Sequence, residues 1–201
     1  MRLVVIGAGH VGRPLADGWT AAGHDVATPP RGAEREALDG ADVVVLAVPY
    51  PALADLLPPL ADTLAGTVVI DCTNPVGPGL SHGLGSTTSG SQQVQALLPR
   101  ARVAKAFSIY GWENLADNRF EAPLPPMMMI AADDAAAART ASALAADLGW
   151  DPLIVGGLEQ ALHLEHLTLL WIRMVRAGGH HPHIVWARLE RGANGPTGTG
   201  G

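Results

Sequence analysis

The fold of this chain is decided by residues 3–12, which read LVVIGAGHVG. The first four residues are apolar and mostly β-branched, which is typical of a strand buried on both faces. A GxGxxG pattern follows at once. The residues from Val11 to Ala22 then show helical spacing, with Leu15 and Trp19 on one face. A strand, a glycine turn and a helix in this order predict a binding site for a dinucleotide.

Each glycine of this turn has its own task in such a site. Gly7 permits the tight turn, Gly9 lets the backbone approach a pyrophosphate, and Gly12 lets the helix pack closely on the strand. The helix N-terminus then faces the pyrophosphate charge, so we expect His10 and Val11 to contact the cofactor as well. The alternative is a strand–turn–helix glycine cluster that holds no ligand.

The end of the second expected strand, residues 25–28, indicates which dinucleotide binds. An NAD site places Asp or Glu there for the ribose 2′-hydroxyl. This chain instead has Thr28-Pro29-Pro30-Arg31, with no acid. Arg31 and Arg35 are one helical turn apart, and two guanidinium groups suit the 2′-phosphate of NADP. The sequence therefore favours NADP over NAD, with Thr28 as a further contact. The alternative for Arg35, which lies between two glutamates, is a solvated helix face.

The rest of the chain continues the alternation of strands and helices. This pattern predicts a doubly wound parallel sheet of the Rossmann type, with helices on both faces. Further strands are expected at residues 42–48, 67–70, 102–107 and 127–131. Further helices are expected at residues 32–38, 52–64, 91–98, 133–148 and 158–175, with Ser91 as the cap of one and Pro58 and Pro59 as kinks in another. Residues 76–90 are expected to form a long loop without secondary structure, of the kind that is functional or mobile.

The domain organisation follows from this pattern. We expect the NADP-binding domain at residues 1–156, a helical C-terminal dimerisation segment at 157–192 and a flexible tail at 193–201. The helix expected at 158–175 is apolar on most of its sides, so it needs burial on most of its sides. This indicates an interface in a homodimer.

Ligands of open parallel sheets bind outside the carboxyl ends of the strands. Two further strand ends therefore belong beside the nicotinamide. The candidates are Ala47, Val48 and Pro49 after the third strand, and Thr73 and Asn74 after the fourth. Cys72 is expected to be a small buried apolar side chain rather than a nucleophile.

Composition excludes several classes of protein. The chain has 201 residues, of which 48% are hydrophobic and 16% charged, as in a globular protein with a core. The net charge of −6 argues against a nucleic-acid partner. One cysteine excludes a disulfide framework. A strand that starts at once leaves no room for a signal peptide, and no apolar run is long enough for a membrane, so we expect a cytoplasmic protein with no membrane partner.

The histidines raise the question of a metal site. His163 and His166 are three residues apart, and a second cluster contains His180, His181 and His183. Neither spacing is a known metalloprotease signature. We therefore expect no metal, and assign these histidines to interfaces or helix caps.

Six pieces of the sequence together resemble the family of NADPH-dependent oxidoreductases typified by the F420-dependent NADP reductase. The matching pieces are residues 5–12, 45–50, 69–75, 98–108, 131–134 and 164–172. The glycine motif alone is shared by many families, whereas the ordered set is much more specific. The resemblance extends from Met1 to about Leu189.

The resemblance implies a Rossmann domain with a small helical C-terminal piece, usually dimeric, that uses NADP(H) together with coenzyme F420, an 8-hydroxy-5-deazaflavin. It implies that Arg31 and Arg35 hold the 2′-phosphate, that residues 47–49 flank the ribose and nicotinamide, and that Ser108, Ile109 and Tyr110 line the cleft of the hydride acceptor. The chain departs from the family at Ser108, where members commonly carry Asn, and the family itself varies between residues 109 and 113.

Three functions remain open from the sequence. Hydride transfer to a deazaflavin needs stacked rings more than it needs an acid or a base. An NADPH-dependent reductase of an imine, a ketone or a flavin would instead want a proton donor, for which Tyr110, Lys105, Tyr50 and His10 are candidates. The third possibility is a regulatory protein that binds a dinucleotide without turnover. We take Ser108, Tyr110 and Lys105 as candidate catalytic residues. The alternatives are that Lys105 anchors a carboxylate and that Tyr110 is pocket wall.

Overall fold

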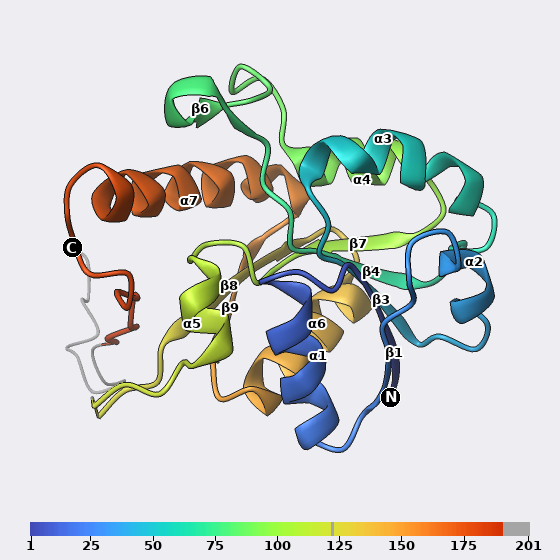
Figure 1. Cartoon of the computed structure of the whole chain (residues 1–201), viewed down its shortest axis with the longest axis horizontal. Coiled ribbons are helices and arrows are strands. Elements are labelled where there is room, and N and C mark those ends of the chain that lie inside the picture. Colours follow the sequence, from blue (N-terminus) through green and yellow to red (C-terminus); the bar gives the residue numbers. More distant parts are fainter. Residues whose placement is uncertain (122, 191–201) are drawn as a thin grey trace, which may run out of the picture.

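The computed structural model describes residues 1–121 and 123–190 (Figure 1), so the tail expected at 193–201 lies outside the described residues. The strands are β1 (Arg2–Ile6), β2 (Asp25–Ala27), β3 (Val43–Leu46), β4 (Val68–Asp71), β5 (Val76–Gly77), β6 (Ser81–His82), β7 (Arg102–Lys105), β8 (Met127–Ala132) and β9 (Asp151–Gly156). The α-helices are α1 (Gly12–Ala21), α2 (Glu34–Ala37), α3 (Leu53–Leu56), α4 (Gly90–Leu97), α5 (Trp112–Ala116), α6 (Ala135–Asp147) and α7 (Ala161–Arg176).

The main sheet has seven strands in the order β2-β1-β3-β4-β7-β8-β9. In Figure 1, α3, α4 and α7 lie above this sheet, and α1 and α6 lie below it. The predicted doubly wound α/β fold is therefore confirmed. The five strands from β2 to β7 are parallel, so the chain leaves β1, β3, β4 and β7 at one edge of the sheet.

Two strands differ from the prediction of a parallel sheet. β8 is antiparallel to β7, and β9, which the sequence analysis missed, pairs parallel with β8 at the end of the sheet. A parallel return from β7 would need a crossover helix that covers the sheet. The link between β7 and β8 contains only the five-residue helix α5, and the chain returns antiparallel. α6 then connects β8 to β9 as an ordinary crossover.

Three local features of the structure differ from the sequence-based predictions. The helix expected at residues 52–64 is broken into α3 and two short 3-10 turns, at Tyr50–Ala52 and Pro58–Leu60, because proline cannot continue the helical hydrogen bonds. The expected loop 76–90 contains the small hairpin β5–β6. Ser89 rather than Ser91 caps α4, in a capping box with Gln92.

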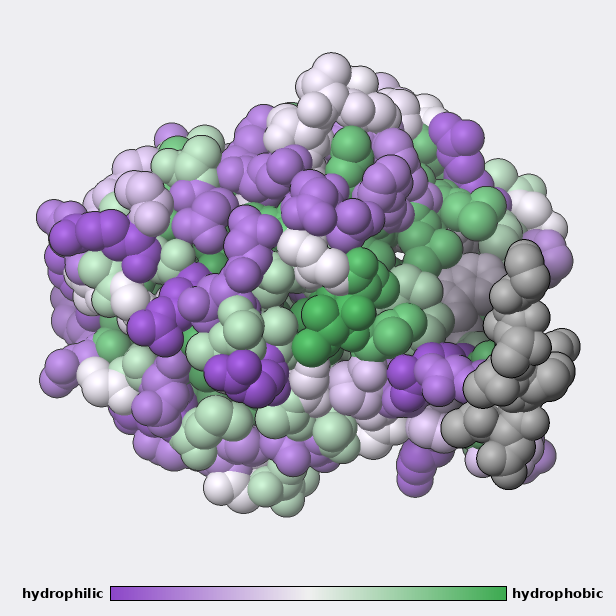
Figure 2. All heavy atoms as spheres, turned by 180° about the vertical axis from the view of Figure 1, so that it is seen from behind, coloured by the Kyte–Doolittle hydropathy of each residue, from purple (hydrophilic) through white to green (hydrophobic). Residues whose placement is uncertain are grey.

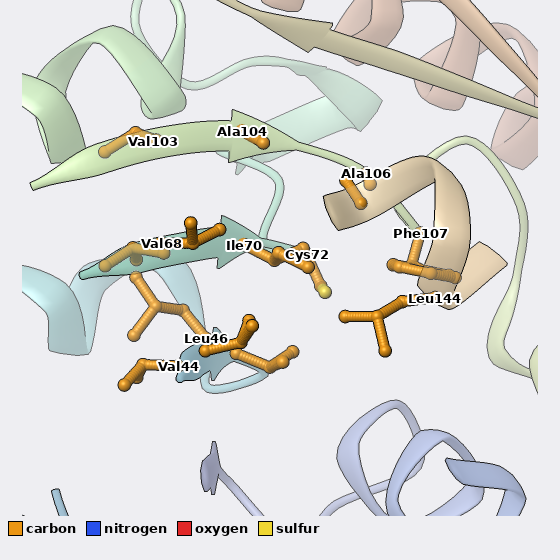
Figure 3. Packing of buried hydrophobic residues seen from close by; sticks show 14 of the residues in the cluster. Val44, Leu46, Val68, Ile70, Cys72, Val103, Ala104, Ala106, Phe107 and Leu144 are labelled. Carbon is orange, nitrogen blue, oxygen red and sulfur yellow. The ribbon is translucent and has the colours of Figure 1, made fainter. Parts of the chain in front are cut away.

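The core lies on both faces of the central strands. Figure 3 shows Leu46, Ile70 and Cys72 among the apolar side chains of this core, with Phe107 and Leu144 nearby. Cys72 is 5% exposed, as expected for a small apolar side chain, and burial raises the pKa of its thiol above the ordinary value. This thiol is therefore protonated and enclosed rather than poised as a nucleophile.

The C-terminal helix α7 is less uniformly buried than its composition indicates. One face, which includes Leu164, Thr168 and Trp171, is buried within this chain, whereas Leu170 is 50% exposed. Figure 2 shows that apolar side chains also gather near the middle of the back face of the molecule, within a mostly hydrophilic surface. The homodimer and the boundaries of the dimerisation segment stay predictions.

Candidate functional site

The glycine turn joins β1 to α1 and forms the floor of the candidate site. Gly7 has a φ of +114°, and a Cβ there would overlap the carbonyl oxygen of Ala47. A Cβ at Gly12 would overlap the carbonyl oxygen of Gly7. At Gly9, in contrast, a Cβ would meet nothing within 4 Å. Two glycines are thus required by the packing of the protein itself, and only Gly9 leaves open space against the backbone.

The N-terminus of α1 points into this open space without a partner from a side chain. Val11 is the N-cap residue, and no side chain caps the helix among the described residues. The N–H groups of Arg13 and Leu15 donate to the carbonyls of Gly9 and Val11, and Pro14 has no N–H. The N–H of Gly12 is therefore the one left at this helix end, which carries the positive end of the dipole. The open face of Gly9 and this helix end together fit a pyrophosphate.

His10 and Trp112 form a stacked pair at the rim of the turn. Their ring centroids are 4.5 Å apart, with 26° between the planes. His10 is exposed, and Trp112, the first residue of α5, is 40% exposed. The sequence analysis singled out His10 but did not single out Trp112. The stack connects the turn after β1 to the segment after β7.

The two arginines after β2 have different surroundings. Arg31 is exposed, and it takes part in none of the ion pairs within residues 1–121 and 123–190. Arg35 donates to the hydroxyl of Thr63 at 3.3 Å and to the carbonyl of Pro59. Arg31 is thus the free cation at this strand end, next to exposed Thr28, whereas Arg35 is engaged with the chain after α3.

The ends of β3 and β4 reach the same edge of the sheet. The backbone N–H of Ala47 donates to Ile6, and its carbonyl lies against Gly7. Val48 is half-buried and Pro49 is exposed. These three residues therefore form a wall beside the glycine turn.

Thr73 and Asn74 follow β4 and behave differently. The hydroxyl of Thr73 donates to Asp71 Oδ1 at 2.7 Å, so it serves the protein itself. Asn74 donates through Nδ2 to the carbonyl of Ser108 at 3.0 Å. Asn74 Oδ1 and Ser108 Oγ are buried and have no hydrogen-bond partner within the described part of the chain. Because a buried polar atom without a partner is costly, this pair is suited to a polar group of a ligand.

The structure places Tyr110 away from the surface of the cleft. Phe107 has a φ of +55° at the end of β7, and the three residues that follow it are buried. The Tyr110 hydroxyl donates to the carbonyl of Met127 at 2.7 Å and accepts the N–H of Trp186 at 3.2 Å. Burial raises its pKa above the ordinary value. Tyr110 is thus buried, and its hydroxyl bonds β8 to the C-terminal segment. The prediction that Tyr110 lines the acceptor cleft is corrected by this position.

Lys105 is fully buried in a cluster of charged groups. Its Nζ lies 3.4 Å from Asp71 Oδ2 and 3.3 Å from Glu165 Oε1, and it also donates to the carbonyl of Thr73. Ser91 donates to Asp71 Oδ2 at 2.6 Å. Lys105 is thus an anchor for two carboxylates, which was the alternative to a catalytic role.

Glu165 brings the hairpin into this cluster. Its Oε1 accepts the N–H of Gly90 at 2.9 Å, and its Oε2 lies 2.7 Å from His82 Nε2. His82 Nδ1 accepts the N–H groups of Leu84 and Ser86, so the ring proton is on Nε2 and is donated to Glu165. The sequence analysis missed this pair, because no local pattern relates residues 83 positions apart. A buried Glu in an otherwise apolar helix face was the available signal.

The other histidines do not form a metal site. His166 lies 2.9 Å from Ser86 Oγ, and the rings of His181 and His183 lie 5.3 Å apart on the surface with 45° between their planes. Within residues 1–121 and 123–190, no group of three or more His, Cys, Asp or Glu side chains could hold a metal ion. No helix of the same residues is long and apolar enough to cross a membrane.

Comparison with known proteins finds similarity to NADP oxidoreductases. The family model described as NADP oxidoreductase, coenzyme F420-dependent, matches residues 29–75, from the end of β2 to the segment after β4. A solved structure from Arthrobacter sp. FB24, of a protein proposed to be an F420-dependent NADP reductase, is 26% identical. The match covers 90% of this chain and 96% of that chain, with a TM-score of 0.78. The chain is thus similar to NADP oxidoreductases of this family in the matched segment and in its overall fold.

Two proteins of other kinds are also similar to this chain. The metalloreductase STEAP3 of Rattus norvegicus is 27% identical over 184 residues, which are 82% of this chain and 36% of that protein. This chain thus spans about a third of the length of the curated relative. An imine reductase of Streptomyces aurantiacus is 16% identical over 88% of this chain and 64% of that one, with a TM-score of 0.62, and shows the fold alone.

Proposed function

We propose that this chain transfers hydride between NADP(H) and coenzyme F420, in a cleft at the carboxyl ends of β1, β3, β4 and β7. The observation that carries the proposal is the open face of Gly9 at the uncapped N-terminus of α1. This open face, next to the positive end of the α1 dipole, lets a pyrophosphate approach the backbone. The choice of F420 rests on the family match.

The residues of the chain would bind and orient the two reactants. The N-terminus of α1, with the N–H of Gly12, would hold the pyrophosphate, and Arg31 would hold the 2′-phosphate. The wall at residues 47–49 would flank the ribose and ring. Asn74 Oδ1 and Ser108 Oγ would pair with a polar group of the nicotinamide or of the acceptor. When bound, the nicotinamide supplies the hydride, and NADPH, a proton and F420 give NADP⁺ and reduced F420.

The surroundings of three of the four candidate acids support a deazaflavin acceptor over a carbonyl or imine, whereas the fourth, His10, is exposed and stacks on Trp112. Reduction of those groups needs a proton donor in the cleft. Lys105 and Tyr110 are both enclosed and bonded to other groups of the protein. The Tyr50 hydroxyl donates to Gln93 at 2.6 Å, and burial, with Glu165 and Asp71 nearby, raises its pKa. Hydride transfer between two stacked rings depends on their orientation more than on a proton donor from the protein.

The test follows the absorbance of both chromophores in a mixture of purified protein, NADPH and oxidised F420. We expect NADPH and oxidised F420 to disappear together in equal amounts. A Tyr110→Phe variant that folds should keep this transfer, because no proton passes through Tyr110. NADPH binding without transfer would contradict the assignment of F420 as acceptor. Failure to bind NADPH would contradict the proposal as a whole.

A further inference from the structure

A second hollow lies between the hairpin segment and α7, apart from the glycine turn. Its volume is about 420 Å³. Its polar lining is formed by Ser81, His82, Ser86, His166 and Arg173, and two leucines of α7 complete it. No acidic side chain lines it. In a chain with a net charge of −6, a hollow with an arginine and no carboxylate in its lining is a local exception.

Arg173 is held in place without a counter-ion. Its Nε and Nη2 donate to the carbonyl of Leu80 at 3.2 and 2.9 Å. None of the ion pairs found among the described residues includes it, whereas Arg176, one turn further on, pairs with Glu113 at 2.9 Å. A guanidinium that is oriented by a carbonyl and faces no carboxylate is suited to an incoming anion.

Two residues in the hairpin wall of the hollow have strained backbone conformations. Leu80 and Ser86 have φ values of +55° and +58°, which are unusual for residues other than glycine. Each is pinned to α7, Leu80 through Arg173 and Ser86 through His166. Strained residues persist where surrounding contacts hold them, and they cluster at sites that bind ligands. The hollow is therefore preformed rather than a gap between loosely packed segments.

A chain of polar contacts connects the hollow to the end of β7, beside the proposed acceptor cleft. His82 lines the hollow, and its other side bonds to Glu165, which bonds to Lys105 at the end of β7. Thr168, next to a leucine of the hollow, donates to the carbonyl of Ser108 at 2.8 Å. A ligand whose reactive ring lies beside Ser108 could therefore extend a flexible tail to Arg173.

We propose that this hollow binds a phosphate or carboxylate group on the tail of the hydride acceptor, with Arg173 as its principal cation. This inference rests on the proposed function and adds a binding subsite to it. The deazaflavin ring of F420 carries a flexible, acidic tail with phosphate and carboxylate groups. The ring would lie at the strand ends, and the tail would provide the anion.

The test measures binding of two fluorescent probes, F420 and its deazaflavin core without the acidic tail, to the protein with NADP⁺ present. We expect Arg173→Gln to weaken F420 binding by about tenfold or more, as loss of a charged hydrogen bond does, and to leave binding of the core unchanged. Arg173→Lys should restore part of the loss. The matched control is Arg176→Gln, which removes the same charge outside the hollow and should change F420 binding by less than about twofold.

The outcomes separate the two proposals. Equal losses in Arg173→Gln and Arg176→Gln, no loss in Arg173→Gln, or an equal loss for the tail-less core would overturn the anion subsite, even if hydride transfer to F420 occurs. Selective loss in Arg173→Gln without any hydride transfer would support the subsite and overturn the proposed reaction. Wild-type protein that binds neither probe would overturn both. Thermal unfolding of each variant checks that the hairpin remains folded.

Discussion

Arg31 and Arg35 show how one residue type takes two roles at one strand end. They have equal charge and lie one helical turn apart, so their spacing alone assigns both to the 2′-phosphate. The structure separates them, because Arg35 donates to Thr63 and Pro59 while Arg31 enters no ion pair in the described ranges. A cation whose donors are free is the better partner for a phosphate.

At this scale we predict the effect of Arg31→Asp on the choice of cofactor. The variant should bind NADPH at least about tenfold more weakly, because an acid replaces a cation beside the 2′-phosphate, and NADH binding should change by less than about threefold. Fluorescence titration with both nucleotides measures this. Arg35→Asp is the matched control and should have the smaller effect. Equal weakening of NADPH and NADH would rule out the assignment of Arg31.

The glycine turn acts as one element with two kinds of glycine. Gly7 and Gly12 are needed because backbone atoms of the turn and of residue 47 fill the space where their Cβ atoms would lie. Gly9 has no such neighbour. The fold therefore depends on two of these glycines, and we propose that binding depends on the third.

We predict that alanine separates these roles. Gly9→Ala should keep the stability of the protein within about 0.5 kcal/mol, because its site is open, and should weaken NADPH binding strongly. Gly12→Ala should destabilise the fold, because its methyl group overlaps a carbonyl oxygen that has no room to move. Urea denaturation and NADPH titration of both variants measure the two effects. Normal NADPH affinity in Gly9→Ala would contradict the placement of the pyrophosphate.

Across the whole molecule, the buried cluster around Lys105 connects elements that are far apart in the sequence. Lys105 on β7 meets Asp71 on β4 and Glu165 on α7, and Glu165 continues to α4 and to the hairpin. Lys105 is the single lysine of the chain. Its ammonium has three donors for three acceptors, which the five donors of an arginine would not match.

We predict that Lys105→Met lowers the free energy of unfolding by about 3–5 kcal/mol, because it leaves two buried carboxylates without their cation. Lys105→Arg should not restore it. Urea denaturation measures the change. The control is Arg100→Met, which removes an ion pair with Asp62 whose side chains are 63% and 96% exposed, and this should cost less than about 1 kcal/mol. A Lys105→Met protein as stable as Arg100→Met would contradict the account of the cluster.

Local patterns predicted the elements that depend on neighbouring residues. The apolar run before Gly7, the glycine spacing and the acid-free end of β2 are short-range features, so they indicated the Rossmann fold and the cofactor class from the sequence. The ends of β3 and β4 were also found, because parallel strands must deliver their carboxyl ends to one edge. β9 and the reversal at β8 were missed, since strand direction depends on how a connection packs rather than on its composition.

The sequence by itself determined the doubly wound fold and the glycine turn, and it indicated a nucleotide with a 2′-phosphate, because these follow from the local patterns of strands, helices and strand ends. Only the tertiary structure decided that Tyr110 is enclosed and that Lys105 is an anchor. It also decided that His82 meets Glu165 and that Arg173 donates to the carbonyl of Leu80. Such contacts join residues 60 to 93 positions apart, and packing, not local propensity, selects them.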